Sequence, residues 1–150
     1  MNWKQVFLGA VVFWVVTNVF GMFVTGYLIH DKILDPDYRA HSQLWVPELN
    51  QDPPDMAALI PNWLTISFIT SLVVAGIYSR VKGSFSGPAW KKGLTWGFCV
   101  GLLASVSYFA LTGFMALSTK IAIWWSIDAL ILYVLGGAAM GWAVAKWASD

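Results

Sequence analysis

Four long apolar segments alternate with polar stretches along the chain. The apolar segments run over about 5–29, 63–79, 93–117 and 121–145, and the longest polar stretch is 30–61. A bilayer core of about 30 Å is crossed by a helix of about 17–25 mainly apolar residues, so each segment is long enough to span it. The pattern therefore predicts four transmembrane helices.

The polar connections predict how these helices are arranged. Residues 118–120 leave room only for a tight turn between the last two helices, and residues 80–92 form a short basic connection. Short connections favour antiparallel neighbours. We expect an all-α fold, a single transmembrane domain over 1–150 that forms an antiparallel four-helix bundle. The stretch 30–61 is then one long outer loop between helices 1 and 2.

Composition supports this class of protein. Of the 150 residues, 58% are hydrophobic and 11% are charged, whereas soluble domains average about 25% charged residues. The net charge of +1 gives no reason to expect a nucleic acid partner. A single cysteine, Cys99, excludes an internal disulfide and leaves the redox compartment open.

The basic residues indicate an orientation. With both termini in the cytoplasm, the inner side holds Lys4, Arg80, Lys82, Lys91, Lys92 and Lys146, and the outer side holds Lys32, Arg39 and Lys120. This distribution favours an N-in/C-in topology in the inner (cytoplasmic) membrane, as a multi-pass protein. Trp63, Trp124 and Trp125 then fall near the outer interface, where we expect them to be anchors.

Each predicted helix has a stripe of polar or small residues on one face. An ionisable residue inside a span is costly and marks a functional hypothesis. The polar residues at comparable depth in the outer half are Asn18, Ser67, Ser71, Tyr108 and Asp128. We expect them to form one hydrogen-bonded cluster around Asp128. The cluster is either a polar knot that fixes helix register, at about 1 kcal/mol per bond, or a binding or proton-exchange site.

Glycines form a second pattern in the last two helices. Gly97 and Gly101 are four residues apart in the third helix, and Gly137 and Gly141 repeat that spacing in the fourth. Such spacing lets helix backbones approach closely. Gly137 follows Asp128 by nine positions (137 − 128), which is half a turn of rotation at 100° per residue. If Asp128 faces the bundle interior, the glycines face outward, toward lipid or another protein chain.

Catalytic and metal-binding patterns are weak. His30, Asp31, Asp35, Asp37 and His41 in the outer loop lack a recognised ligand spacing, so we expect them to be solvated rather than to bind a metal. The sequence contains no recognisable nucleophile–base pair and no nucleotide-binding loop. We therefore expect no catalytic residue, no cofactor and no enzymatic activity.

The layout resembles small uncharacterised four-span bacterial membrane proteins. These carry a polar residue in the first span, an acid in the fourth and glycines near the C-terminus, here Asn18, Asp128 and Gly137/Gly141. The resemblance covers the whole length and implies no particular activity. Four-span multidrug exporters are less similar, because they are organised around a carboxylate in the first span, where this chain has Asn18.

Two functions are expected from these patterns. The first is an accessory or structural subunit of a larger membrane complex, or a homo-oligomer, whose partners are membrane lipids and other protein chains or a second copy. The alternative is a small transporter or lipophile-binding protein that uses the Asp128 cluster.

Overall fold

The computed structural model describes residues 2–148, and this part of the chain is helical and contains no strand. Within it, four helices are long and apolar enough to cross a membrane. The elements are α1 (Trp3–Phe20), η1 (Gly21–Leu34), α2 (Asp35–Ala40), η2 (Ser42–Leu44), η3 (Pro47–Asn50), α3 (Met56–Val81), η4 (Lys82–Ser84), α4 (Ala89–Leu111) and α5 (Thr119–Trp147). The first spanning helix is continuous over Trp3–Ala40 because α1, η1 and α2 follow one another without a break.

Polar side chains define the starts of three helices. The side chain of Asn2 accepts hydrogen bonds from the first amides of α1, that of Asp55 accepts one from Ala58 in α3, and that of Ser118 accepts one from Ile121 in α5. These caps satisfy amides that have no partner inside a helix. The capped starts are local features that the sequence alone can specify.

The first helix is longer than the sequence predicted. It was expected to end at residue 29, but η1 continues to Leu34 with π-helical hydrogen bonds. A π-helix pairs residue i with i+5 rather than i+4, which changes the residues that face the interior. The buried residues of η1 are accordingly Thr25, Ile29 and Leu34, at spacings of four and five. This winding places His30 beside the bundle rather than in a loop.

The other bounds also differ from the predicted ones. α3 begins at Met56, seven residues before 63, and contains Pro61 within the helix. α4 ends at Leu111, six residues before 117. The predicted loop 30–61 is largely occupied by the end of η1 and the short helices α2, η2 and η3. Hydropathy did not detect these ends because α3 starts inside a polar, proline-containing stretch and α4 ends inside an apolar one.

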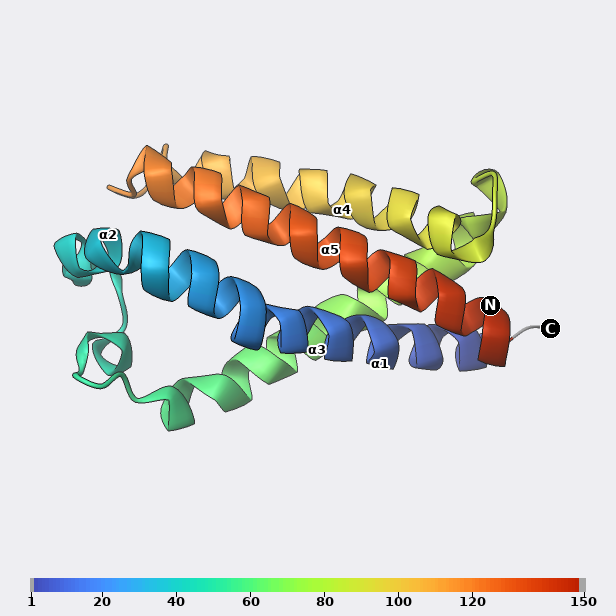
Figure 1. The fold of residues 1–150 in the computed structure, drawn as a ribbon, viewed down its shortest axis with the longest axis horizontal. Helices are drawn as coiled ribbons and strands as arrows, with labels where there is room; N and C mark the ends of the chain where they lie inside the picture. Colours follow the sequence, from blue (N-terminus) through green and yellow to red (C-terminus); the bar gives the residue numbers. More distant parts are fainter. Residues whose placement is uncertain (1, 149–150) are drawn as a thin grey trace.

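The helices α4 and α5 lie side by side along their length, and α1 packs on the other side of α5 (Figure 1). A Cβ atom at Gly93 would overlap the backbone of Gly137, and one at Gly137 would overlap Gly93 in return. Gly97 likewise lies against the Tyr133 carbonyl group. Glycine is required here because the backbones touch.

The predicted outward orientation of this glycine face is therefore wrong. Gly97, Gly101, Gly137 and Gly141 are all buried within the chain, and they form the contact between α4 and α5. The error has a geometric cause: α5 has neighbours on two sides. Asp128 faces one neighbour, η1, while the glycines face the other, α4.

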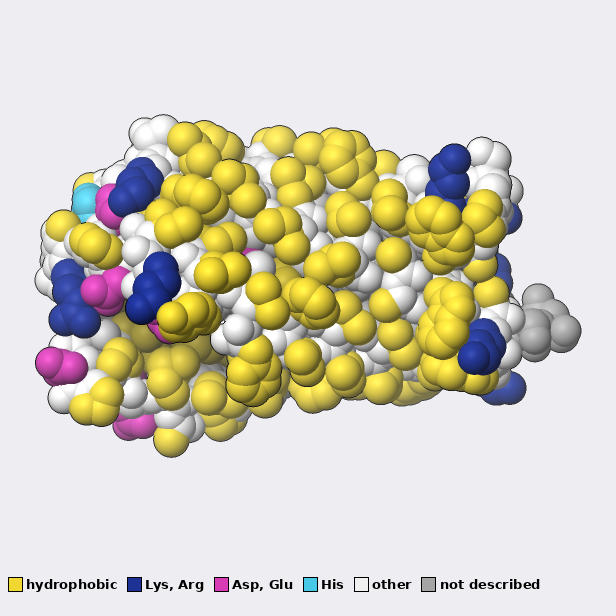
Figure 2. Space-filling view, in the orientation of Figure 1, with side chains coloured by type: hydrophobic (Ala, Val, Ile, Leu, Met, Phe, Trp, Pro, Cys, Tyr) yellow, Lys and Arg dark blue, Asp and Glu magenta, His cyan; other side chains and the backbone are white. Residues whose placement is uncertain are grey.

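Charge is distributed unequally between the two ends of the molecule. The start of α1, the end of α5 and η4 lie at one end, here called the terminal end, and α2 lies at the other, the α2 end (Figure 1). On the face in Figure 2, hydrophobic side chains cover the middle, Lys and Arg gather at the terminal end, and groups of both signs gather at the α2 end. This distribution is typical of a membrane protein.

Two apolar cores, one toward each end of the molecule, hold the helices together. Toward the terminal end, Phe13 and Met140 are almost completely buried in a cluster with α3 side chains such as Val74. Toward the α2 end, Leu34 and Ile121 are fully buried in a second cluster. The second cluster attaches η1 to α5 and so fixes the residues of the site described next.

Candidate functional site

A cavity of about 400 Å³ lies near the α2 end, between η1, α3, α4 and α5. It is lined by His30, Trp63, Tyr108, Trp125 and Asp128. The volume falls within the range of small-molecule sites, which are mainly apolar with a few polar groups that orient the ligand. We call it the aromatic cavity.

A chain of polar contacts crosses one wall of the aromatic cavity. The indole N–H of Trp125 donates to the Tyr38 hydroxyl oxygen at 2.7 Å. The same oxygen lies 2.6 Å from Nδ1 of His30, and Nε2 of His30 lies 3.3 Å from Oδ2 of Asp128. The series links the Trp125 indole to the carboxylate of Asp128.

Donor and acceptor chemistry indicates which group donates each hydrogen bond in this series of contacts. An indole N–H can only donate, so the Tyr38 oxygen accepts from it and its own proton is available for Nδ1 of His30. With Nδ1 accepting, a neutral imidazole carries its proton on Nε2, which then donates to Asp128. Both ring nitrogens of His30 are thus engaged, Nδ1 by Tyr38 and Nε2 by Asp128.

The second carboxylate oxygen of Asp128 has no such partner. Oδ1 is buried and makes no hydrogen bond to any group in residues 2–148. The Asp128 side chain is 16% exposed and that of His30 33%. A buried acceptor without a partner costs free energy, and Oδ1 belongs to a residue that lines the aromatic cavity. Asp128 therefore has an acceptor atom that no group of the described chain satisfies, in a residue that lines the aromatic cavity.

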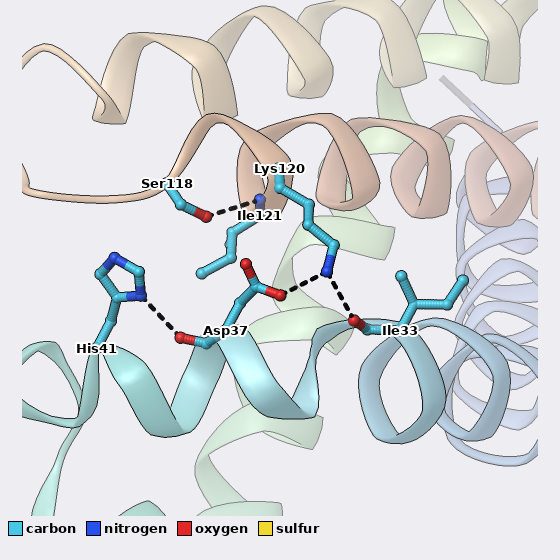
Figure 3. A network of polar contacts seen from close by, with 6 residues as sticks. All are labelled: Ile33, Asp37, His41, Ser118, Lys120 and Ile121. Carbon is cyan, nitrogen blue, oxygen red and sulfur yellow. Dashed lines mark hydrogen bonds and ion pairs between the residues drawn. The ribbon is translucent and has the colours of Figure 1, made fainter.

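Tyr38 is held in place by contacts at the α2 end. Lys120, in the first turn of α5, donates to the Asp37 carboxylate at 2.6 Å and to the Ile33 carbonyl oxygen at 3.2 Å (Figure 3). The indole N–H of Trp45 donates to the Tyr38 carbonyl oxygen at 2.8 Å. The Lys120 bonds fasten η1 and α2 to α5, and the Trp45 bond holds the backbone of Tyr38. The Tyr38 hydroxyl group therefore reaches both His30 and Trp125.

The polar residues predicted for the site are divided between two places. Asn18 and Ser67 do meet: the Asn18 amide donates to the Ser67 hydroxyl oxygen at 3.2 Å, and the Trp14 indole donates to the same oxygen at 3.0 Å. Ser71 donates to the Ser67 carbonyl oxygen within α3. No hydrogen bond within residues 2–148 connects this group to Asp128. Asn18, Ser67 and Ser71 form a contact between α1 and α3 instead.

Tyr108 is the one predicted companion that lies at the Asp128 site. It lines the aromatic cavity, and its ring packs edge-on against Trp125 with centroids 5.6 Å apart. Trp63 and Trp125 were expected to be interface anchors, and both line the cavity. Their place at the cavity follows from the tilt of α3 and the packing of α2, which the sequence pattern does not describe.

Sequence reasoning missed His30 and Tyr38. Both were assigned to a solvated loop because hydropathy falls after Ile29. A signal for them existed in the apolar positions Ile33 and Leu34, which continue the helix beyond the hydrophobic run. No group of three or more His, Cys, Asp or Glu residues within 2–148 could hold a metal ion.

Comparisons with known proteins do not add to this geometry. No family model, curated protein or solved structure matches the sequence. The function is therefore inferred from the aromatic cavity and its contacts.

Proposed function

We propose that this protein is a non-enzymatic integral membrane protein that binds a small amphipathic molecule in the aromatic cavity. The observation that carries the proposal is the buried Oδ1 atom of Asp128, which has no hydrogen-bond partner in the described chain and whose residue lines a cavity of about 400 Å³. A ligand that donates a hydrogen bond to Oδ1 would satisfy it.

The chemistry of the walls favours an amine. Asp128 offers one acceptor atom, Oδ1, that has no partner in the described chain. Aromatic faces such as those of Trp63 and Trp125 attract cations, and an ammonium group pairs with a carboxylate through charge-assisted hydrogen bonds. The rest of the ligand would be apolar, because Trp63, Tyr108 and Trp125 supply most of the lining.

A role for His30 as a general base is disfavoured by the same contacts. A general base needs a nitrogen or oxygen free to accept the proton of a substrate. Both nitrogens of His30 are engaged, by Tyr38 and by Asp128. A binding role would use Oδ1 of Asp128 as the acceptor and would leave both contacts of His30 in place.

A role as an accessory subunit has lost its main support. It rested on an outward glycine face, and Gly137 and Gly141 instead pack against Gly93 and Gly97 of the same chain. We therefore favour the ligand-binding alternative, whose residues come together in one cavity.

The proposal includes an orientation. Four antiparallel spans with both termini in the cytoplasm would place the basic terminal end inside and the aromatic cavity in the outer half of the inner membrane. A ligand could then enter from the outer leaflet or from the outer aqueous phase.

Three probes with the same aromatic body test the binding site. Phenethylamine, phenethyl alcohol and ethylbenzene differ in the group they present to Asp128. Thermal stabilisation of the purified full chain in detergent should rank the amine above the alcohol and the alcohol above the hydrocarbon. Asp128→Asn keeps the volume but removes the charge, so it should weaken amine binding about tenfold and alcohol binding much less.

Ser67→Ala is the matched control, because Ser67 lies in a span but bonds to Asn18 and Trp14 rather than to Asp128. It should leave the ranking of the probes unchanged. Equal binding of the three probes, or an unchanged amine affinity in Asp128→Asn, would contradict the proposal.

A further inference from the structure

A second cavity, of about 300 Å³, lies at the terminal end, between the end of α3, η4, the start of α4 and the end of α5. Its polar lining is Lys82 and Lys92, and its apolar lining includes Tyr78, Val144 and Ala145. We call it the lysine cavity. Two ammonium groups beside an apolar wall match a ligand with an anionic head and a hydrocarbon body.

Lys82 is held in position by a neutral partner. Its ammonium group donates to the side-chain oxygen of Gln5. Gln5 is itself buried and donates to the Ala148 carbonyl oxygen at 2.9 Å. An amide oxygen orients an ammonium group but does not neutralise it, so the positive charge of Lys82 remains at the edge of the cavity.

No acidic residue within 2–148 balances this charge. The acids of the described chain are Asp128 and those between residues 31 and 55, toward the α2 end. The ion pairs found in this part of the chain are His30–Asp128, Arg39–Asp35 and Lys120–Asp37, and none includes Lys82 or Lys92. The cavity is therefore complementary to an anion.

The surrounding tryptophans indicate the depth of the lysine cavity in a membrane. The side chains of Trp3, Trp90, Trp142 and Trp147 are all about half exposed or more at the terminal end. Exposed tryptophans concentrate at the level of lipid headgroups. The lysine cavity then lies at the level of the lipid headgroups, where the anionic group of a membrane lipid is its phosphate.

We propose that the lysine cavity binds the phosphate-bearing headgroup of an anionic phospholipid, with Lys82 and Lys92 as its cationic contacts. The acyl chains would leave along the apolar surface beside Val144 and Ala145. This site is separate from the aromatic cavity and does not depend on the function proposed above.

Native mass spectrometry of the full chain, released from nanodiscs of equal parts phosphatidylglycerol and phosphatidylcholine, tests the proposal. The wild-type protein should retain phosphatidylglycerol selectively. The double variant Lys82→Gln/Lys92→Gln should lower that selectivity about thirtyfold, since each lysine near an anionic headgroup contributes a factor of about five. Lys4→Gln/Lys146→Gln removes the same charge at the same end but outside the cavity, and should retain the lipid.

A second variant distinguishes loss of the site from loss of the fold. Ala145→Phe fills the cavity without changing any charge and should lower retention to a similar degree, with unchanged helicity. An equal loss in the Lys4/Lys146 control would overturn the proposal in favour of general surface charge. Complete displacement of the lipid by excess inorganic phosphate would overturn it in favour of a site for the free ion.

Discussion

Nε2 of His30 lies 3.3 Å from Oδ2 of Asp128, although 98 positions separate the two residues in the chain. The contact joins the first spanning helix to the last. It depends on η1, whose π-helical winding continues the first helix past residue 29. An extended π-helical segment is rare, and shorter ones occur frequently at functional sites.

Replacing His30 should affect ligand binding more than folding. His30→Ala removes the partner of Asp128 Oδ2 and one partner of the Tyr38 hydroxyl group, so the carboxylate is no longer held in one orientation. We expect about tenfold weaker binding of phenethylamine, because the loss of one hydrogen bond to a charged group has about this effect. Calorimetry in detergent would measure it.

His41→Ala is the matched control for this variant. His41 bonds through Nδ1 to the Asp37 carbonyl oxygen (Figure 3) and does not line the aromatic cavity. Amine binding should stay within about twofold of the wild type. If His41→Ala weakened binding as strongly as His30→Ala, the specific role of His30 would be refuted.

Tyr38→Phe should destabilise the α2 end. The change removes the oxygen that accepts from Trp125 and contacts His30, and two polar groups lose their partner. Hydrogen bonds inside membrane proteins are worth about 0.6 kcal/mol on average, so we expect a loss of about 1–2 kcal/mol in the free energy of unfolding. Tyr27→Phe, on an exposed side chain, should change it by less than about 0.5 kcal/mol. Denaturation in mixed micelles compares the two, and equal effects would argue against the bridging role of Tyr38.

Alanine at Gly97 should force α4 and α5 apart. The added Cβ atom would overlap the Tyr133 carbonyl group, which is backbone and cannot move alone. Overpacking of this kind costs about 1–3 kcal/mol. Gly76 is the control: a Cβ atom there meets nothing within 4 Å, and alanine should be neutral or stabilise α3 by up to about 1 kcal/mol. SDS titration followed by tryptophan fluorescence measures both, and a neutral Gly97→Ala would show that the two helices are not in close contact.

Breaking the Lys120–Asp37 pair should loosen α2 rather than unfold the protein. Lys120→Gln removes the donor to the Asp37 carboxylate and to the Ile33 carbonyl oxygen. Such a partly exposed pair contributes about 0–1 kcal/mol, so global stability should change little. Hydrogen exchange in residues 33–41 should become several times faster. Arg39→Gln breaks only the pair with Asp35 inside α2 and should leave exchange at Ile33 unaltered.

The candidate site was predicted in part. Asp128 and Tyr108 were predicted to lie together, and both line the aromatic cavity. Asn18 and Ser67 were predicted to belong to the Asp128 cluster, but they contact each other between α1 and α3 instead. Helix faces derived from a regular 100° rotation could not reveal this division, because they ignore both tilt and the change of winding in η1.

The sequence by itself determined that four helices are long and apolar enough to cross a membrane, because span length and hydropathy are local properties. It also determined where close helix contact is possible, since small residues four positions apart, such as Gly137 and Gly141, permit it. Only the tertiary structure decided which neighbour each face of α5 meets. Asp128 and the glycines of α5 lie half a turn apart, and both meet a neighbouring helix because α5 packs against η1 on one side and α4 on the other.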